Sequence, residues 1–169
     1  MLSRTLLLFY TRRSDLTPAE FQEYMEQKYI PILKETMGAY APIATTLRFT
    51  ERCGSGYGDR LGAKLASKYR NHPDAPVLLV GHPKDLGWDA MMELSFKDDL
   101  HLMQGYAVVN GEEGQRVHDS EAEFTVPEAM KVVLMERNTM SSPATEVPGS
   151  ETCSASHANR AAKNIAAWQ

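Results

Sequence analysis

The sequence has few cysteines and no residue pattern typical of a metal site or a disulfide framework. Cys53 and Cys153 lie far apart, in a Gly-rich segment and a polar tail, and neither belongs to a CxxC pair or a Cys/His cluster. Structural metal sites and disulfide-rich folds need such clusters. We therefore expect no bound metal and two free thiols, as in a reducing, cytoplasmic compartment.

An excess of basic residues is also missing. The chain has 18 Lys and Arg against 22 Asp and Glu, a net charge of -4, and its basic residues are scattered. Nucleic-acid-binding domains instead gather positive charge on one face. The apolar run at residues 6–11 is too short for a signal-peptide core or a membrane span. A soluble protein that binds neither nucleic acid nor membrane is expected.

The sequence lacks the motifs of serine hydrolases, zinc proteases and nucleotide-binding enzymes. It contains no GxSxG nucleophile elbow and no HExxH helix. The glycines at residues 54–58 neither follow a strand nor open a capped helix, and Gly62-Ala63-Lys64 departs from the phosphate-loop pattern. Hydride transfer and nucleotide-driven reactions are thus disfavoured, and we expect no cofactor.

What the sequence does contain is a strand followed at once by a well-specified helix. Residues 5–11 are apolar and aromatic with little alternation, which predicts a central strand covered on both faces. Thr17, Pro18 and Glu20 form a capping box with proline at the first helical position. Pro31 should kink this helix or end its first section.

Later segments complete the order strand, helix, strand, strand, helix, strand. Strands are predicted at residues 42–50, 88–96 and 130–137, and a helix at 97–109 with Leu100, Met103 and Ala107 as its buried stripe. A brief edge or loop strand is expected at 76–80. The order indicates an α+β class with a ferredoxin-like βαββαβ antiparallel sheet and two helices on one face.

Two segments fall outside this pattern. Residues 51–76 are rich in glycine and are interpreted as an insertion, in which 61–69 form a short basic helix. Residues 138–169 are dominated by Ser, Thr, Pro, Ala and Glu, which predicts a polar, flexible C-terminal tail that can dock by its last few residues.

A sheet roofed by helices encloses a pocket that is mostly apolar, with a few converging polar groups. Two sets of residues are candidates for this site. The predicted apolar lining consists of Phe9, Phe21, Met25, Ile32, Trp88, Met91 and Met103. The alternative for each of these is ordinary core packing, since stripes at helical spacing usually pack.

The polar candidates divide into catalytic and substrate-binding residues. Tyr29, Asp89 and His101 are the predicted catalytic residues, and the further polar candidates are Tyr10, Arg48, His82, Glu93 and His118. A buried, unpaired carboxylate would have a raised pKa and act as a general base. The alternatives are a Tyr29 hydroxyl in water, Asp89 and Glu93 at strand ends or paired with Arg48 or Lys131, and solvated histidines.

Several stretches resemble the EthD-like domain family: the first strand ending in paired basic residues, LTPAEFQEYMEQKYIPIL, WDAMMELSF, VHDSEAEFTV and VVLMER. The resemblance leads us to place an EthD-like domain at residues 1–137. It implies a dimeric α/β barrel, hence a homodimer, and a kinship with fungal enzymes that tailor aromatic polyketides. Family members often have a His two positions before Pro in the first helix, where this chain has Tyr29.

The resulting hypothesis is a cofactor-independent tailoring enzyme, of lyase or cyclase type, that acts on an aromatic or polyketide-derived molecule in secondary metabolism. It would move protons to drive dehydration, cyclisation or decarboxylation: a carboxylate or His removes the proton, and Tyr29 or Arg48 stabilises the enolate. Two alternatives remain open, a cofactor-free monooxygenase of the same fold and a non-catalytic ligand-binding accessory dimer.

Overall fold

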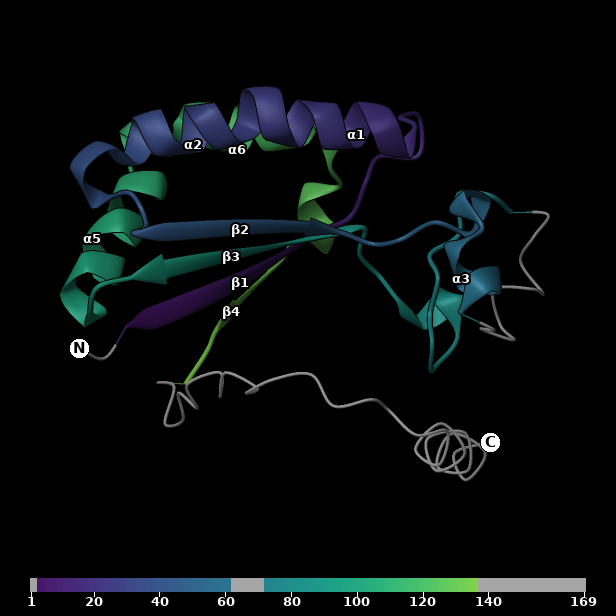
Figure 1. The fold of residues 1–169 in the computed structure, drawn as a ribbon. Coiled ribbons are helices and arrows are strands. Elements are labelled where there is room, and N and C mark those ends of the chain that lie inside the picture. The colour runs from purple at the N-terminus through teal and green to yellow at the C-terminus, as the bar shows by residue number, and fades with distance from the viewer. Residues whose placement is uncertain (1–2, 62–71, 137–169) are drawn as a thin grey trace, which may run out of the picture. The chain divides into compact units, whose positions relative to one another are not determined.

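The computed structural model describes residues 3–61 and 72–136, which contain a four-stranded antiparallel sheet in the order β2-β3-β1-β4. The strands are β1 (Arg4–Tyr10), β2 (Ala44–Phe49), β3 (Ala90–Phe96) and β4 (Lys131–Leu134). Figure 1 shows the helices α1, α2 and α6 lying along one face of the sheet. Strand order and connectivity confirm the predicted ferredoxin-like α+β fold.

β1 lies between β3 and β4, as its apolar sequence predicted. Burial alternates along it: Leu6, Leu8 and Tyr10 are buried toward the helices, whereas Leu7 and Phe9 on the other face are half-buried. A strand exposes successive side chains to opposite faces, and the described helices cover only one of them. The opposite side of the sheet is called the outer face below.

The first helix begins as predicted and then changes its winding. Thr17 and Glu20 form the capping box of α1 (Pro18–Tyr24), and a π-helical turn (Met25–Tyr29) connects it to α2 (Ile30–Met37). Pro31 has no N–H to donate, so it cannot occupy the interior of a regular α-helix, but it fits the first turn of one. It lies in the first turn of α2, and the π turn before it joins the two α-helical sections.

The helix α5 (Asp99–Val109) is present, but its predicted buried stripe is wrong. Leu100 and Met103 are 63% and 64% exposed, whereas Gly105 is buried. A Cβ at Gly105 would lie 2.7 Å from Met37 Cε and 2.9 Å from the Tyr40 carbonyl oxygen. The helix thus packs through its smallest residue, because only glycine allows the backbone to approach so closely.

A third packed helix, α6 (Gln115–Phe124), follows α5 and was not predicted. Its buried residues are Val117, Ser120, Glu121 and Phe124, which fall on one face at helical spacing. The Phe124 ring packs against the rings of four other aromatic residues, Tyr10, Phe21, Tyr24 and Tyr29. This contact fixes α6 against the first helix and β1.

The described part of the region predicted as an insertion contains a 3-10 turn (Cys53–Ser55) and α3 (Tyr57–Arg60). Residues 76–80 form no strand; Pro76 makes an isolated bridge with Arg52. The predicted helix at 61–69 and the tail at 138–169 lie outside the described residues, apart from Leu61. No helix in residues 3–61 and 72–136 is long and apolar enough to cross a membrane.

Gly105→Ala should lower the free energy of unfolding by about 1–3 kcal/mol, because the new methyl overlaps Met37 and the Tyr40 carbonyl. Helix propensity alone would act in the opposite direction, by about 1 kcal/mol in favour of Ala. Urea unfolding of both proteins shows whether the substitution lowers or raises the free energy of unfolding. Gln104→Ala, at an exposed position of the same helix, is the control, and a stabilised Gly105→Ala protein would contradict this packing.

Candidate functional site

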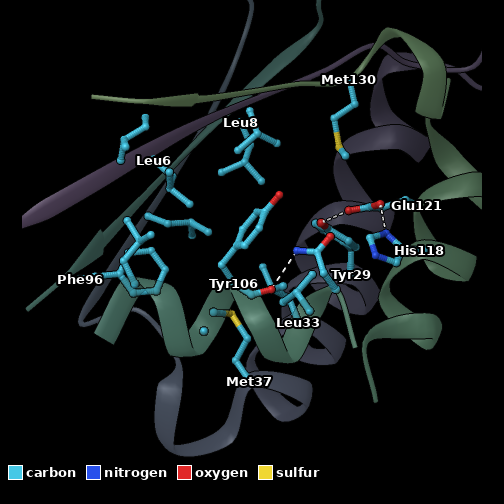
Figure 2. A pocket seen from close by; sticks show the side chains of 17 residues that line it. Leu6, Leu8, Tyr29, Leu33, Met37, Phe96, Tyr106, His118, Glu121 and Met130 are labelled. Carbon is cyan, nitrogen blue, oxygen red and sulfur yellow. Dashed lines mark hydrogen bonds and ion pairs between the residues drawn. The ribbon is translucent and has the colours of Figure 1, made fainter. Parts of the chain in front are cut away.

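A cavity of about 510 Å³ lies between the sheet and the helices α2, α5 and α6. Most of its wall is apolar. The lining side chains from the strands are Leu6, Leu8, Leu94, Phe96, Val132 and Leu134; those from the helices and loops include Leu33, Met37, Leu102, Val109 and Met130. Figure 2 shows the Tyr106 ring of α5 among these side chains, with Tyr29, His118 and Glu121 together at one end.

The polar end of the cavity is a hydrogen-bonded chain of four side chains from three segments. The hydroxyl oxygens of Tyr10 and Tyr29 are 3.0 Å apart. The Tyr29 hydroxyl donates to Glu121 Oε1 at 2.6 Å, and Glu121 Oε2 lies 3.1 Å from His118 Nδ1. The chain Tyr10-Tyr29-Glu121-His118 is called the relay below.

Burial differs sharply along the relay. Tyr10, Tyr29 and Glu121 are 0%, 1% and 4% exposed, whereas the His118 side chain is 43% exposed. A charged carboxylate at such depth is stable only with hydrogen-bond donors around it, and Tyr29 and His118 supply them. His118 is therefore the most accessible member of the relay, and it also lines the cavity.

Both phenols of the relay remain protonated. Loss of solvation raises the pKa of Tyr29 well above its ordinary value of 10.0, and the nearby Tyr10 and Glu121 add to the shift. Burial also raises the pKa of Tyr10, an effect that its hydrogen bond with Tyr29 partly offsets. Neither phenol is a source of negative charge, so the carboxylate of Glu121 is the acceptor toward which the relay is organised.

A carboxylate that holds an imidazole by Nδ1 is the arrangement that orients histidine bases in hydrolases. It fixes the ring plane and stabilises the imidazolium that forms when the other ring nitrogen, Nε2, takes a proton. The Glu121-His118 pair can therefore act as a general base at the end of an apolar cavity.

Of the predicted site residues, the structure brings Tyr29 and His118 together at this cavity. Asp89 lies elsewhere, in an ion-pair cluster with two arginines: its Oδ1 accepts from Arg52 at 2.6 Å and its Oδ2 from the Arg12 backbone N–H at 2.7 Å. The sequence alternatives for Asp89 included pairing with Arg48 or Lys131, and the partners are Arg12 and Arg52. This cluster ties the end of β1 to the start of β3.

His101 belongs to the N-terminal cap of α5. Its backbone N–H donates to Asp98 Oδ1 at 2.8 Å, and its Nδ1 accepts from the Lys97 backbone N–H at 3.3 Å. His82 has a similar local role, because its Nδ1 accepts from the Lys84 backbone N–H at 3.1 Å. Neither residue lines the cavity.

The remaining predicted residues separate onto other surfaces. Phe21 and Met25 are core residues, 1% and 0% exposed, and Met103 is 64% exposed on α5. Ile32 packs against the same core. Four others share the outer face of the sheet, since their strand positions alternate with the buried ones: Phe9, Arg48, Met91 and Glu93. Trp88 precedes β3, and its ring packs against Phe9. None of these lines the cavity between sheet and helices.

Sequence reasoning missed Glu121, Tyr106 and Asn110. For Glu121 a signal was present: Val117, Glu121 and Phe124 recur at i, i+4 and i+7, which places the carboxylate on the apolar face of a helix. For Tyr106 and Asn110 the signal was misleading, because Leu100 and Met103, which look like the buried stripe of α5, lie on its exposed side. Within residues 3–61 and 72–136, no three His, Cys, Asp or Glu side chains group as metal ligands.

Fold and site together define an α+β protein of ferredoxin-like topology with an apolar cavity and one ionisable end. Its family follows from a comparison of the sequence with family models: the EthD domain model matches residues 13–128, and the chain belongs to the EthD domain family. No functionally curated protein matches the chain.

The solved structures to which the chain is similar share little sequence identity with it. An ethyl tert-butyl ether d (EthD) family protein from Bacillus halodurans is 14% identical over 80% of this chain and 98% of its own, with a TM-score of 0.46. An EthD-like protein from Ralstonia eutropha is 15% identical over 80% and 89%, with a TM-score of 0.47. An Arabidopsis thaliana protein is 10% identical over 85% and 94%, with a TM-score of 0.43.

The buried phenols predict a loss of stability at alkaline pH. An unfolded tyrosine loses its proton near pH 10, whereas Tyr10 and Tyr29 keep theirs in the native state. Above about pH 10 the native state thus binds more protons, and stability falls as pH rises, by about 1.4 kcal/mol per pH unit for each phenol.

Tyr10→Phe or Tyr29→Phe should each remove one such contribution to the slope. Urea unfolding between about pH 9 and 11 measures it, at values chosen around the unfolded tyrosine pKa. Tyr57→Phe, at a side chain that is 48% exposed, is the control and should leave the slope as it is. An unchanged slope in both relay variants would mean that the phenols are not buried as described.

Proposed function

We propose that this EthD-domain protein is a cofactor-independent enzyme that transfers protons on an aromatic or polyketide-derived molecule in secondary metabolism. The observation that carries the proposal is the Glu121-His118 pair at the end of an apolar cavity of about 510 Å³. Such a cavity accepts a molecule of several fused rings, and the pair supplies the general base that the reaction needs.

In this proposal the base is His118, in place of the Asp89 and His101 expected from the sequence. His118 Nε2 removes an acidic proton next to a substrate carbonyl, and the electron pair of the broken C–H bond moves onto the carbonyl oxygen as an enolate. The enolate then follows one of two courses. It re-forms the carbonyl and expels a β-hydroxyl, which takes the proton of the imidazolium and departs as water, or its carbon attacks a second carbonyl carbon to close a ring, and the new alkoxide takes that proton; Glu121 stabilises the imidazolium in both.

In this proposal Asn110 donates a hydrogen bond to the enolate oxygen of the substrate. It lines the cavity, and one hydrogen of its amide is used in a 2.8 Å bond to the Tyr106 carbonyl. An amide nitrogen carries two hydrogens, so a second remains for an enolate oxygen. Arg48, the other stabiliser expected from the sequence, lies on the outer face of the sheet and takes no part in this proposal.

Proton exchange tests the proposal with simple ketones in place of the natural substrate. Anthrone and related polyketide-like ketones, incubated with the protein in D₂O, should exchange their acidic C–H protons faster than in buffer, as followed by NMR. His118→Asn should lose about 100-fold or more of this acceleration, the usual worth of a general base.

His101→Asn is the matched control, because it removes an imidazole that accepts from the Lys97 backbone N–H and does not line the cavity. Equal losses in His118→Asn and His101→Asn, or no acceleration by the unsubstituted protein with any ketone, would contradict the proposal. Oxygen uptake during turnover would assign the site to a cofactor-free monooxygenase instead.

We also propose that the protein is a homodimer that pairs through the outer face of the sheet. Apolar side chains collect there although no described element covers them: Phe9 packs on Trp88 with ring centroids 5.3 Å apart, and Val133 of β4 is 42% exposed. Burying an apolar sheet face between two copies is a common basis of twofold association.

Light scattering after size-exclusion chromatography should give twice the chain mass, and Val133→Glu should shift it toward one chain mass. A charge placed in the middle of an apolar interface is costly to desolvate. Val80→Glu, at a loop position that is 81% exposed, is the control and should not change the mass. A single chain mass for the unsubstituted protein would contradict the dimer.

A further inference from the structure

The hydrogen bonds of the relay have a definite direction, because the protons available are few. A phenol carries one proton and an ionised carboxylate carries none. The 2.6 Å distance from the Tyr29 hydroxyl to Glu121 Oε1 is typical of a hydroxyl that donates to an ionised carboxylate, about 2.5–2.7 Å. The single proton of Tyr29 is therefore used toward Glu121.

The other two bonds follow from the first. Since the Tyr29 proton is already engaged, Tyr10 is the donor in the 3.0 Å contact between the two hydroxyls. Since Glu121 is an acceptor only, His118 donates from Nδ1 across the 3.1 Å contact to Oε2. All three hydrogen bonds of the relay thus point toward Glu121.

This ordering decides what the cavity offers to a ligand. A neutral His118 that keeps its proton on Nδ1 has a lone pair on Nε2, and no described residue hydrogen-bonds to that atom. The carboxylate behind it is negative, and the lining residues include no Lys or Arg that would offset its charge. The polar end favours a proton donor and disfavours an anion.

We propose that the cavity selects neutral aromatic ligands that carry a phenol or enol hydroxyl, and that it binds them by donation of this hydroxyl to His118 Nε2. The inference concerns the site of the proposed function and names its ligand class, but it requires binding only and no reaction. The apolar walls accept the rings, and Tyr106 among them offers an aromatic surface.

Three naphthalenes of similar size test whether the cavity prefers a neutral hydrogen-bond donor. 2-Naphthol donates a hydrogen bond, 2-methoxynaphthalene cannot donate one, and 2-naphthoate is an anion. Dissociation constants are measured by fluorescence titration of the full chain near pH 8, where imidazole is ordinarily neutral. 2-Naphthol should bind about tenfold more tightly than 2-methoxynaphthalene, the worth of one hydrogen bond, and 2-naphthoate should bind most weakly.

Glu121→Gln tests whether the relay sets this preference. It keeps the shape of the side chain but lets an amide donate to His118 Nδ1, which moves the ring proton to Nε2 and removes the acceptor. The preference for 2-naphthol should fall to about onefold or reverse. Glu123→Gln, on the exposed side of the same helix and hydrogen-bonded to Tyr24, is the matched control and should keep it.

His118→Phe provides a second variant that does not depend on the fold tolerating a change at the buried Glu121. It should bind 2-naphthol and 2-methoxynaphthalene equally, since the acceptor is gone and the apolar wall remains. Equal affinities in the unsubstituted protein, or tightest binding of 2-naphthoate, would overturn the proposed selection. Failure of all three to bind would overturn both the selection and the proposed function, whereas a naphthol preference without proton exchange would overturn only the latter.

Discussion

The desolvation of one carboxylate constrains the whole site. Glu121 is 4% exposed, and an ion buried in this way costs several kcal/mol unless donors surround it. Its donors come from the π turn of the first helix and from α6 itself, through Tyr29 and His118. Any rearrangement of the first helix against α6 would remove the Tyr29 donor from this buried charge, so the carboxylate constrains how these two helices pack.

The π turn explains how the first helix places a hydrogen-bond donor next to Glu121. Between Tyr24 and Ile30 the backbone is wound more widely than an α-helix, and from this turn the Tyr29 side chain extends to Glu121. The proline two residues later prevents regular α-helical bonding at this point. A residue that looks in the sequence like a helix breaker therefore sets the position of the buried phenol, and Phe124 holds the same tyrosine from the other side.

The sheet separates the ionisable residues into two populations. Side chains that point toward the helices meet the cavity and the relay, whereas Asp89 is joined to Arg12 and Arg52 at the end of the sheet, and Glu93 lies on the outer face. Asp89, just before β3, and Glu93 within it are separated by an even number of positions, which the sequence alone could show. Odd-numbered positions along β3 face away from the helices, so neither carboxylate lines the cavity.

The sequence by itself determined the order of the four strands, the first helix and α5, but not α6. It also determined the capping box at Thr17, the central position of β1 and membership of the EthD family, because these depend on local sequence patterns. It identified Tyr29 and His118 as polar candidates but did not join them. Tyr29 and Glu121 are 92 positions apart, and period-two alternation says which residues share a face without saying which face the helices cover. The rotation of α5 about its axis was likewise decided by the close approach at Gly105 and not by its largest apolar residues. Only the tertiary structure settled these points, because they depend on which surfaces of separate elements fit together.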